Sequence, residues 1–151
     1  MNQDIGFLLT HIDNTAWYDN ILKQIRLLID NNPYKHICVF NSYSEKLDTY
    51  NVPLLHISQA KFFEGNIFVF DIVALCIIKN FPLIQNKYFF SRDIPWYRSY
   101  NNYEEWTNIF KQNNLNIIAQ NQEIHDLYEI CWQKPIDIME NFEYDKLSKI
   151  L

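Results

Sequence analysis

The sequence predicts an α/β fold: a three-layer, Rossmann-like sandwich with a mostly parallel sheet, in a single domain that covers residues 1–151. Short apolar runs alternate with longer segments in which apolar residues recur at helical spacing. The short runs are almost continuously apolar, which is typical of strands that are buried on both faces of a parallel sheet. No linker, repeat or low-complexity segment divides the chain, so we expect one domain.

In the first half of the chain, strands are expected where four or five apolar residues follow one another. Asn14 or Thr15 can cap a long helix, which ends before Pro33. Gly65 closes a short helical turn. The expected elements are strands at 5–9, 36–40, 52–57 and 66–70, a helix at 17–29 and a helical turn at 58–64.

In the second half, the apolar segment 72–80 is ambiguous because it could continue the preceding strand. Ala74, Leu75 and the stop at Pro82 favour a buried helix, with Asp71 placed to cap it. The other expected elements are strands at 87–90, 115–119 and 136–139 and helices at 103–111, 124–132 and 144–151.

The composition excludes several classes of protein. With only two glycines, Gly6 and Gly65, the chain cannot contain a glycine-rich phosphate loop. A net charge of −5 and the lack of any Lys/Arg run make nucleic acid an unlikely partner. No two of the cysteines have the spacing of a metal or redox pair, so we expect three reduced, buried thiols and a cytoplasmic protein.

No membrane segment or secretion signal is expected. The most apolar stretch, residues 66–78, is interrupted by Asp71 and is shorter than the roughly 20 residues that cross a bilayer. The N-terminus lacks a basic region and a small-residue cleavage site. The sequence also predicts no metal and no cofactor. The abundance of Asn and Ile suggests a coding genome rich in A and T, such as that of many phages.

Polar residues follow most of the predicted strands. In an open parallel sheet, ligands bind beyond the carboxyl ends of the strands, so these residues are the candidates for a binding site. Each could instead cap a helix or lie in a solvated loop. The candidates for substrate binding are Thr10, Asn41, Ser42, Ser91, Arg92, Asp93, Trp96 and Gln120.

His11 and Asp13 are the candidates for catalysis. An imidazole titrates near neutrality, and a nearby carboxylate could orient it as a general base. The alternative is a loop histidine beside a solvated carboxylate.

The segment from Arg92 to Trp96 is the second candidate. Arg92 could grip a phosphate or carboxylate as a fork, and Trp96 could stack on a sugar or base. Alternatively, Arg92 and Asp93 form an internal pair and Trp96 anchors the loop to the core. Trp96 also begins an aromatic segment with Tyr97, Tyr100 and Tyr103 that could bind another protein or form a homodimer.

The end of the chain resembles a known family. The sequences NIIAQNQEIHDLY at 116–128 and KPIDIMENF at 134–142 resemble the last part of the N-terminal domain of GT-B-fold glycosyltransferases. The first strand, the helix that begins near Trp17 and Phe81-Pro82 ahead of a strand also fit that domain. In this family the C-terminal domain holds most of the sugar nucleotide, and the chain ends where that domain would begin. The resemblance therefore implies a single half that lacks most of the donor site.

Two hypotheses follow. The first is a glycosyltransferase-like domain that binds a sugar, nucleotide or glycosylated acceptor at the carboxyl edge of the sheet. Whether it is an enzyme is left open; if it is, His11 or Asp13 would be the base, Arg92 would contact phosphate or acceptor, and a partner domain would be needed. The second is a non-catalytic interaction domain that uses the aromatic segment.

Overall fold

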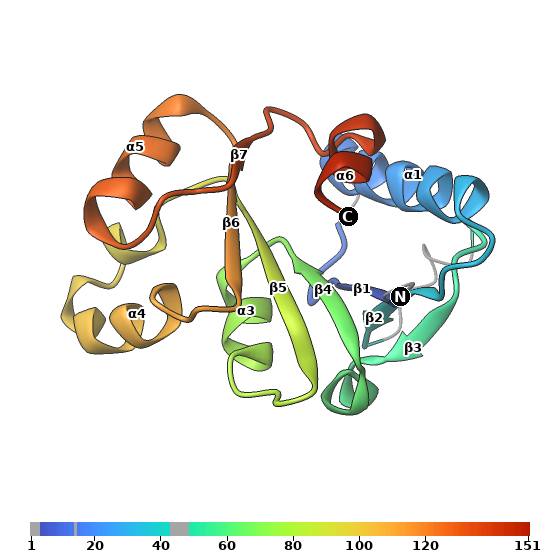
Figure 1. Ribbon diagram of the computed structural model, residues 1–151, viewed down its shortest axis with the longest axis horizontal. Coiled ribbons are helices and arrows are strands. Elements are labelled where there is room, and N and C mark those ends of the chain that lie inside the picture. Colours follow the sequence, from blue (N-terminus) through green and yellow to red (C-terminus); the bar gives the residue numbers. More distant parts are fainter. Residues whose placement is uncertain (1–3, 14, 43–48) are drawn as a thin grey trace.

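The computed structural model describes residues 4–13, 15–42 and 49–151, and in it one seven-stranded sheet runs through the molecule (Figure 1). The strands lie in the order β3-β2-β1-β4-β5-β6-β7, and every neighbouring pair is parallel. The strands are β1 (Ile5–Leu8), β2 (Ile37–Asn41), β3 (Leu54–His56), β4 (Gly65–Val69), β5 (Ile84–Ser91), β6 (Leu115–Ala119) and β7 (Asp137–Ile138). The predicted α/β, Rossmann-like fold is confirmed.

Helices cover both faces of this sheet. In Figure 1, α1 and α6 lie together on one side and α3, α4 and α5 lie on the other. The helices are α1 (Ala16–Asn31), α3 (Ile72–Ile78), α4 (Tyr103–Phe110), α5 (Gln122–Cys131) and α6 (Tyr144–Ile150), with 3₁₀ helices η1 (Ile57–Phe62), η2 (Pro95–Tyr97) and η3 (Tyr100–Asn102). None of the helices in the described ranges is both long and apolar enough to cross a bilayer.

The strand sequences divide the core into two halves. Successive strand residues point to opposite faces, so Phe7 packs toward α1 and α6 while Leu8 packs toward the other helices. Phe90 and Phe89 of β5 divide in the same way. Each strand is covered by helices on both faces, so successive residues of a strand are both buried and both apolar. This explains the continuous apolar runs in the sequence.

The C-terminal segment closes the face that α1 covers. The ring of Phe142 meets the rings of Phe7, Phe68, Phe70 and Phe90 edge to face, with centroids 4.8–6.4 Å apart. The amide of Asn20 on α1 donates a hydrogen bond to the carbonyl of Phe142 at 2.9 Å. These contacts hold α6 beside α1.

Local signals define the helix starts. Asp71 caps α3 by accepting a hydrogen bond from the amide of Ala74 at 2.7 Å, and the ambiguous segment 72–80 is helical, as favoured, from Ile72 to Ile78. Asn121 caps α5 by accepting from the amide of Ile124. Thr15 is the cap residue of α1 but makes no side-chain capping bond, while Asn14, the other cap candidate, lies outside the described residues.

Several boundaries differ from the prediction by one to three residues, and the starts of β5 and β3 are two of them. β5 begins at Ile84 rather than at residue 87, because Asn86 pairs with Asn66 of β4 through its backbone register and its side-chain amide. These two polar side chains hydrogen-bond to each other at the start of the strand. A pattern of apolar residues therefore does not reveal where the strand begins. β3 is also shorter than predicted, at three residues.

Gly65 holds a backbone conformation that side chains disfavour. Its φ is +148°, and a Cβ atom at this position would lie 2.4 Å from the carbonyl oxygen of Asp4. That carbonyl accepts the amide of Asn66, so the two backbones must stay close where β4 begins beside β1. Gly6 is also enclosed, but there a Cβ would meet the rings of Phe40 and Phe63, which can adjust.

We therefore expect Gly65→Ala to lower the free energy of unfolding by roughly 2–4 kcal/mol, because it adds backbone strain to a clash with backbone. Gly6→Ala should cost less, since side-chain rings can move. Urea unfolding of both variants and the wild type measures this order. A Gly65→Ala variant as stable as the wild type would contradict the assigned backbone conformation.

The three cysteines, Cys38, Cys76 and Cys131, are free thiols, and each is half-buried rather than fully buried as predicted. Cys38 lies on β2. Burial, and to a lesser degree the Asp4 carboxylate, raises the pKa of this thiol from 9.0 to about 12. Above pH 9 the unfolded chain therefore loses this proton while the folded protein retains it, so stability falls as the pH rises.

Between pH 8 and pH 10 we expect Cys38 to account for a loss of roughly 1.4 kcal/mol of unfolding free energy. Cys38→Ser and Cys38→Ala cannot ionise there and should lose that much less than the wild type over the same interval. Urea unfolding at both pH values measures the difference. The other groups with shifted pKa values, such as Lys87 and Tyr88, are common to all three proteins, so their contributions cancel. Equal losses in all three proteins would contradict the assignment.

Candidate functional site

The strand order reverses direction at β1. From β1 the chain builds the sheet outward through β2 and β3, and then returns to place β4 on the other side of β1. Ligands in open parallel sheets bind beyond the carboxyl ends of the strands at such a reversal. The side chains that follow β1, β4, β5 and β6 are therefore the candidates for contact with a ligand.

A cavity of about 470 Å³ lies at this edge. Its size is within the range of small-molecule sites, roughly 300–1,000 Å³. Residues from α1, from the ends of β4 and β5, and from the loops after β5 and β6 line it: Tyr18, Phe70, Asp71, Ile72, Phe89, Arg92, Asp93, Arg98 and Gln120. The cavity thus combines an apolar floor with two arginines and two aspartates.

Arg92 is held by an aromatic ring. Its guanidinium carbon lies 4.2 Å from the centre of the Trp17 ring, which itself packs on Phe90 of the core. A cation over an indole face is stabilised by about 0.5–2 kcal/mol. Within the described ranges no carboxylate or carbonyl accepts a hydrogen bond from Arg92. The fork of N–H groups is therefore available to a ligand in the cavity that Arg92 lines.

The predicted internal pair between Arg92 and Asp93 does not form. Asp93 instead forms an ion pair with Arg98, in which Arg98 Nη2 and Asp93 Oδ2 are 3.0 Å apart. Both of these side chains are well exposed at the rim of the cavity. Sequence reasoning did not single out Arg98, although an arginine one turn beyond Pro95 in the same loop was the available signal.

Asp71 joins the ends of β1 and β4. Its Oδ2 accepts a hydrogen bond from the hydroxyl of Thr10 at 2.8 Å, while its Oδ1 caps α3. Thr10 was predicted to bind substrate, and its hydroxyl is used in this bond. Asp71 was predicted only as a helix cap, and the structure adds a place in the cavity wall.

Several charged side chains of the site act on the phenol of Tyr18. Burial first, and then the carboxylates of Asp71 and Asp13, raises the pKa of its phenol, while Arg92 lowers it. Its hydroxyl is therefore a proton donor at neutral pH, in the wall of the cavity. Tyr18 lies in the first turn of α1, where helical spacing alone did not distinguish it from a core residue.

His11 and Asp13, the two predicted catalytic residues, lie in the loop after β1 and do not line the cavity. His11 is exposed, and its ring meets Tyr18 edge to face at 6.3 Å. Asp13 accepts a hydrogen bond from the amide of Thr15 at 2.9 Å, and its charge acts on Tyr18. A catalytic role for either residue stays a prediction.

Asn41 is the last residue of β2 and Ser42 follows it, and neither residue lines the cavity. Asn41 is buried, and its amide donates to the carbonyl of Leu9, which ties the end of β2 to the loop after β1. Ser42 is exposed. The side chain of Gln120, after β6, lines the cavity, and its amide donates to the carbonyl of Glu140 at 3.3 Å.

Ser91 anchors the loop that carries the arginines. Its hydroxyl donates to the carbonyl of Asp93 at 2.8 Å and lies 2.9 Å from the hydroxyl of Tyr128. Because the single proton of Ser91 is used on Asp93, Tyr128 must be the donor to Ser91. Both side chains are fully buried, and burial raises the pKa of Tyr128 well above its usual value. Ser91 therefore positions the loop and is not itself exposed to a ligand.

The sequence left two roles open for Trp96, stacking on a ligand or anchoring its loop to the core. The contacts of its ring are those of an anchor. Its ring meets those of Tyr128, Phe110 and Trp132 edge to face at 4.8–5.7 Å, so it anchors η2 to the core. Tyr97 and Tyr103 are 65% and 63% exposed, and Tyr103 also contacts Trp132. The side chain of Tyr100 lies outside what the structure describes.

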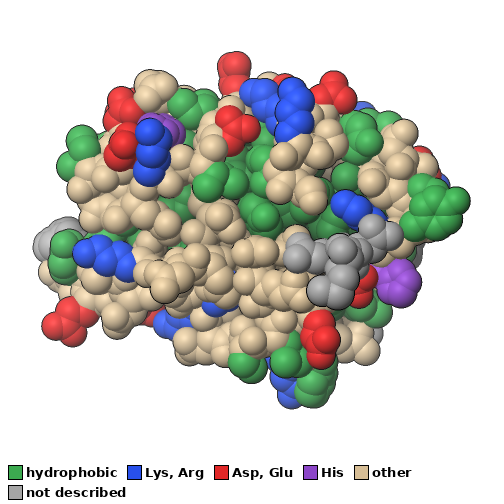
Figure 2. All heavy atoms as spheres, viewed as in Figure 1, with side chains coloured by type: hydrophobic (Ala, Val, Ile, Leu, Met, Phe, Trp, Pro, Cys, Tyr) green, Lys and Arg blue, Asp and Glu red, His purple; other side chains and the backbone are tan. Residues whose placement is uncertain are grey.

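Charges of both signs are mixed on one face of the molecule. On the face shown in Figure 2, lysine and arginine side chains stand close to aspartate and glutamate side chains rather than forming one basic surface. A ligand would therefore be held by a few local charges and not by a broad field.

Comparison of the chain with known protein-family models, with curated protein sequences and with solved structures finds no match.

The Ser91–Tyr128 pair yields a quantitative prediction. Tyr128→Phe should cost about 1–2 kcal/mol of unfolding free energy, because Ser91 keeps its bond to Asp93. Ser91→Ala should cost more, roughly 2–4 kcal/mol, since it leaves both the Tyr128 hydroxyl and the Asp93 carbonyl without this partner. The double variant should cost less than the sum. Urea unfolding of all four proteins measures this cycle, and additive effects would show that the two hydroxyls do not interact.

Proposed function

We propose that this domain binds a small phosphorylated ligand, a nucleotide or a phosphorylated sugar, in the cavity beyond β4, β5 and β6. The main support for this proposal is the position of Arg92 in the cavity wall. Its guanidinium lies over the ring of Trp17, lines the cavity and has no anionic partner in the described part of the chain. A planar fork of donors in such a position fits the oxygens of a phosphate group.

The charges around the cavity favour an anionic group at this point. Asp93 is neutralised by Arg98, and Asp71 is bound by the Thr10 hydroxyl and the Ala74 amide. Among the charged side chains that line the cavity, Arg92 is the cation without an ion-pair partner in the described part of the chain. A phosphate group could form that ion pair, and the Arg98–Asp93 pair at the rim could supply a second contact.

The rest of the cavity suits a polar organic group attached to that phosphate. Tyr18 offers a hydroxyl donor, Gln120 an amide and Asp71 a carboxylate that can accept from a sugar hydroxyl. Phe70 and Phe89 provide apolar surface for a ring. This combination is consistent with the glycosyltransferase-like hypothesis, in which the sheet edge holds a sugar or nucleotide. The proposal concerns binding, and transfer chemistry is left outside it.

The second hypothesis, a protein-interaction domain, is favoured by one observation. Tyr97 and Tyr103 lie at the outer end of the loop after β5 and expose most of their surface. Exposed tyrosines are frequent at protein interfaces. The absence of ligand binding in the experiment below would favour this second function.

The test is a thermal-shift series with uridine and guanosine diphosphates, their sugar conjugates, hexose phosphates and inorganic pyrophosphate. At about 100 times its dissociation constant a ligand stabilises the folded protein by roughly 2.7 kcal/mol. For a domain of this size that is a Tm increase of several degrees. Arg92→Ala should abolish the ligand-induced increase, and Arg92→Lys should reduce it because the fork is lost.

Arg26→Ala is the matched control. Arg26 lies on α1, pairs with Asp30 and donates to the carbonyl of Asn51, away from the cavity lining. Its ligand-induced shift should equal that of the wild type. A shift that survives Arg92→Ala, or no shift with any of these ligands, would overturn the proposal and favour the interaction domain.

A further inference from the structure

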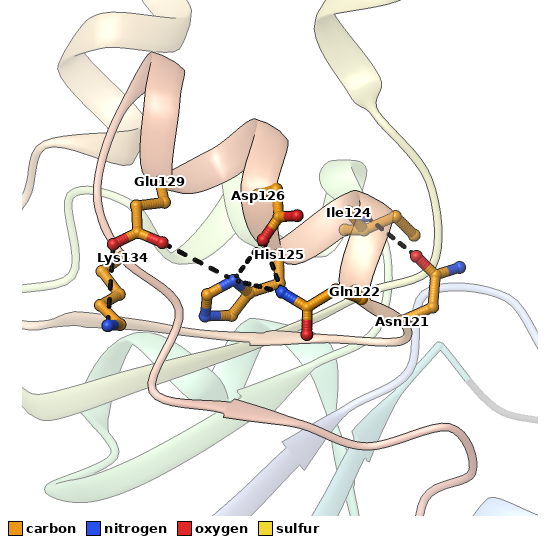
Figure 3. A network of polar contacts seen from close by, with 7 residues as sticks. All are labelled: Asn121, Gln122, Ile124, His125, Asp126, Glu129 and Lys134. Carbon is orange, nitrogen blue, oxygen red and sulfur yellow. Dashed lines mark hydrogen bonds and ion pairs between the residues drawn. The ribbon is translucent and has the colours of Figure 1, made fainter.

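The helix α5 carries a cluster of polar side chains that the proposed function does not use. Gln122, His125, Asp126 and Glu129 have the spacing i, i+3, i+4, i+7, which places all four on one face of the helix. Figure 3 shows them gathered on α5, with Lys134 on the far side of Glu129. None of them lines the cavity at the carboxyl edge.

Three potential metal ligands in this cluster converge on one point. His125 Nδ1 lies 3.1 Å from Asp126 Oδ1 and 3.8 Å from Glu129 Oε2, and the three atoms all lie within 4.8 Å of one another. Donors around one ion at bond lengths of 2.0–2.2 Å are roughly 3.0–3.5 Å apart. The histidine and aspartate already have this spacing, and a small side-chain rotation brings Glu129 to it.

Gln122 offers a fourth donor. Its side-chain nitrogen lies 2.5 Å from Asp126 Oδ1 and 3.5 Å from His125 Nδ1. Turning the amide over by 180° exchanges its nitrogen and oxygen, so that a carbonyl oxygen faces the same point. Amide oxygens are ordinary ligands of divalent ions.

The cluster is held in place and is open to solvent. The His125 side chain is only 13% exposed, so its ring has little freedom, while Asp126 and Glu129 are 55% and 45% exposed. Hydrogen bonds from His125 and then from Gln122 lower the pKa of Asp126. The second oxygen of Glu129 lies 3.7 Å from the Lys134 ammonium, which leaves Oε2 turned to His125.

His125 Nδ1 and Asp126 Oδ1 are within hydrogen-bonding distance of each other, at 3.1 Å. The same nitrogen and oxygen are atoms that can bind a divalent metal ion. A metal ion between them would replace this hydrogen bond with two coordination bonds.

We propose that Gln122, His125, Asp126 and Glu129 form a solvent-facing site for a divalent transition-metal ion, with one imidazole nitrogen and two carboxylate oxygens as its protein ligands and the amide as a fourth. A mixed imidazole and carboxylate set selects zinc, nickel, cobalt or manganese rather than magnesium or calcium. This site is independent of the proposed function, because it shares no residue with the cavity.

The experiment is a titration of the purified protein with Zn²⁺ in competition with a chromogenic metal chelator. The wild type should bind one Zn²⁺ per chain. His125→Ala and Glu129→Gln should each weaken that affinity at least tenfold. His36→Ala is the matched control, because His36 is also beside a carboxylate, Asp4, at 3.8 Å and should leave the affinity unchanged.

A gain of affinity separates metal binding from damage to the fold. Gln122→Glu replaces the amide with a third carboxylate at the first position of α5, where an acidic residue also favours the helix. It should bind Zn²⁺ several-fold more tightly than the wild type. The proposal is overturned if the wild type does not compete with the chelator, if His125→Ala retains its affinity, or if Gln122→Glu binds no better.

Discussion

The reversal of strand order between β1 and β4 is the constraint on which the candidate site depends. Since every described strand pair is parallel, all the carboxyl ends meet at one edge, and the reversal leaves a gap between the connections that leave β1 and β4. A single carboxylate, Asp71, bridges this gap. It binds the Thr10 hydroxyl with one oxygen and starts α3 with the other. The loop after β1 and the helix after β4 are thereby held in one geometry, and the cavity forms beside them.

The loop after β5 is held from below in a comparable way. Ser91 and Tyr128 fix its first residues through hydroxyl groups, and Trp96 inserts its ring among the aromatic side chains of α4 and α5. The arginines therefore lie on a connection whose backbone is already ordered. Binding to an ordered loop costs less conformational entropy than binding to a mobile one. An irregular segment can thus present charged groups as accurately as a helix would.

The sequence predicted the architecture well because burial on both faces leaves a simple pattern, continuous apolar runs between helical spacings. It predicted the candidate site only in part. Arg92, Asp93 and Gln120 line the cavity as their positions after strands indicated, whereas Ser91 is buried and Trp96 packs against the core. The pairing of Asp93 with Arg98 depends on how the loop after β5 folds, and Tyr18 and Asp71, which line the same cavity, are far apart in sequence. The spacing of the polar residues on α5 is visible in the sequence, but the spacing of the cysteines, on which the prediction of no metal drew, gives no sign of it.

The position of Phe142 has a consequence for how the protein is made. Its ring fills the space between four sheet aromatics that are synthesised long before it, and Asn20, which holds its backbone, precedes it by 122 residues. While the ribosome extends the chain, the strands can pair and α1 can dock, yet the phenylalanines beneath remain partly uncovered. The burial of these four rings is therefore complete only after Phe142 has been synthesised and has packed against them. Nascent chains of this protein pass through a stage in which they present an aromatic surface to chaperones and to one another.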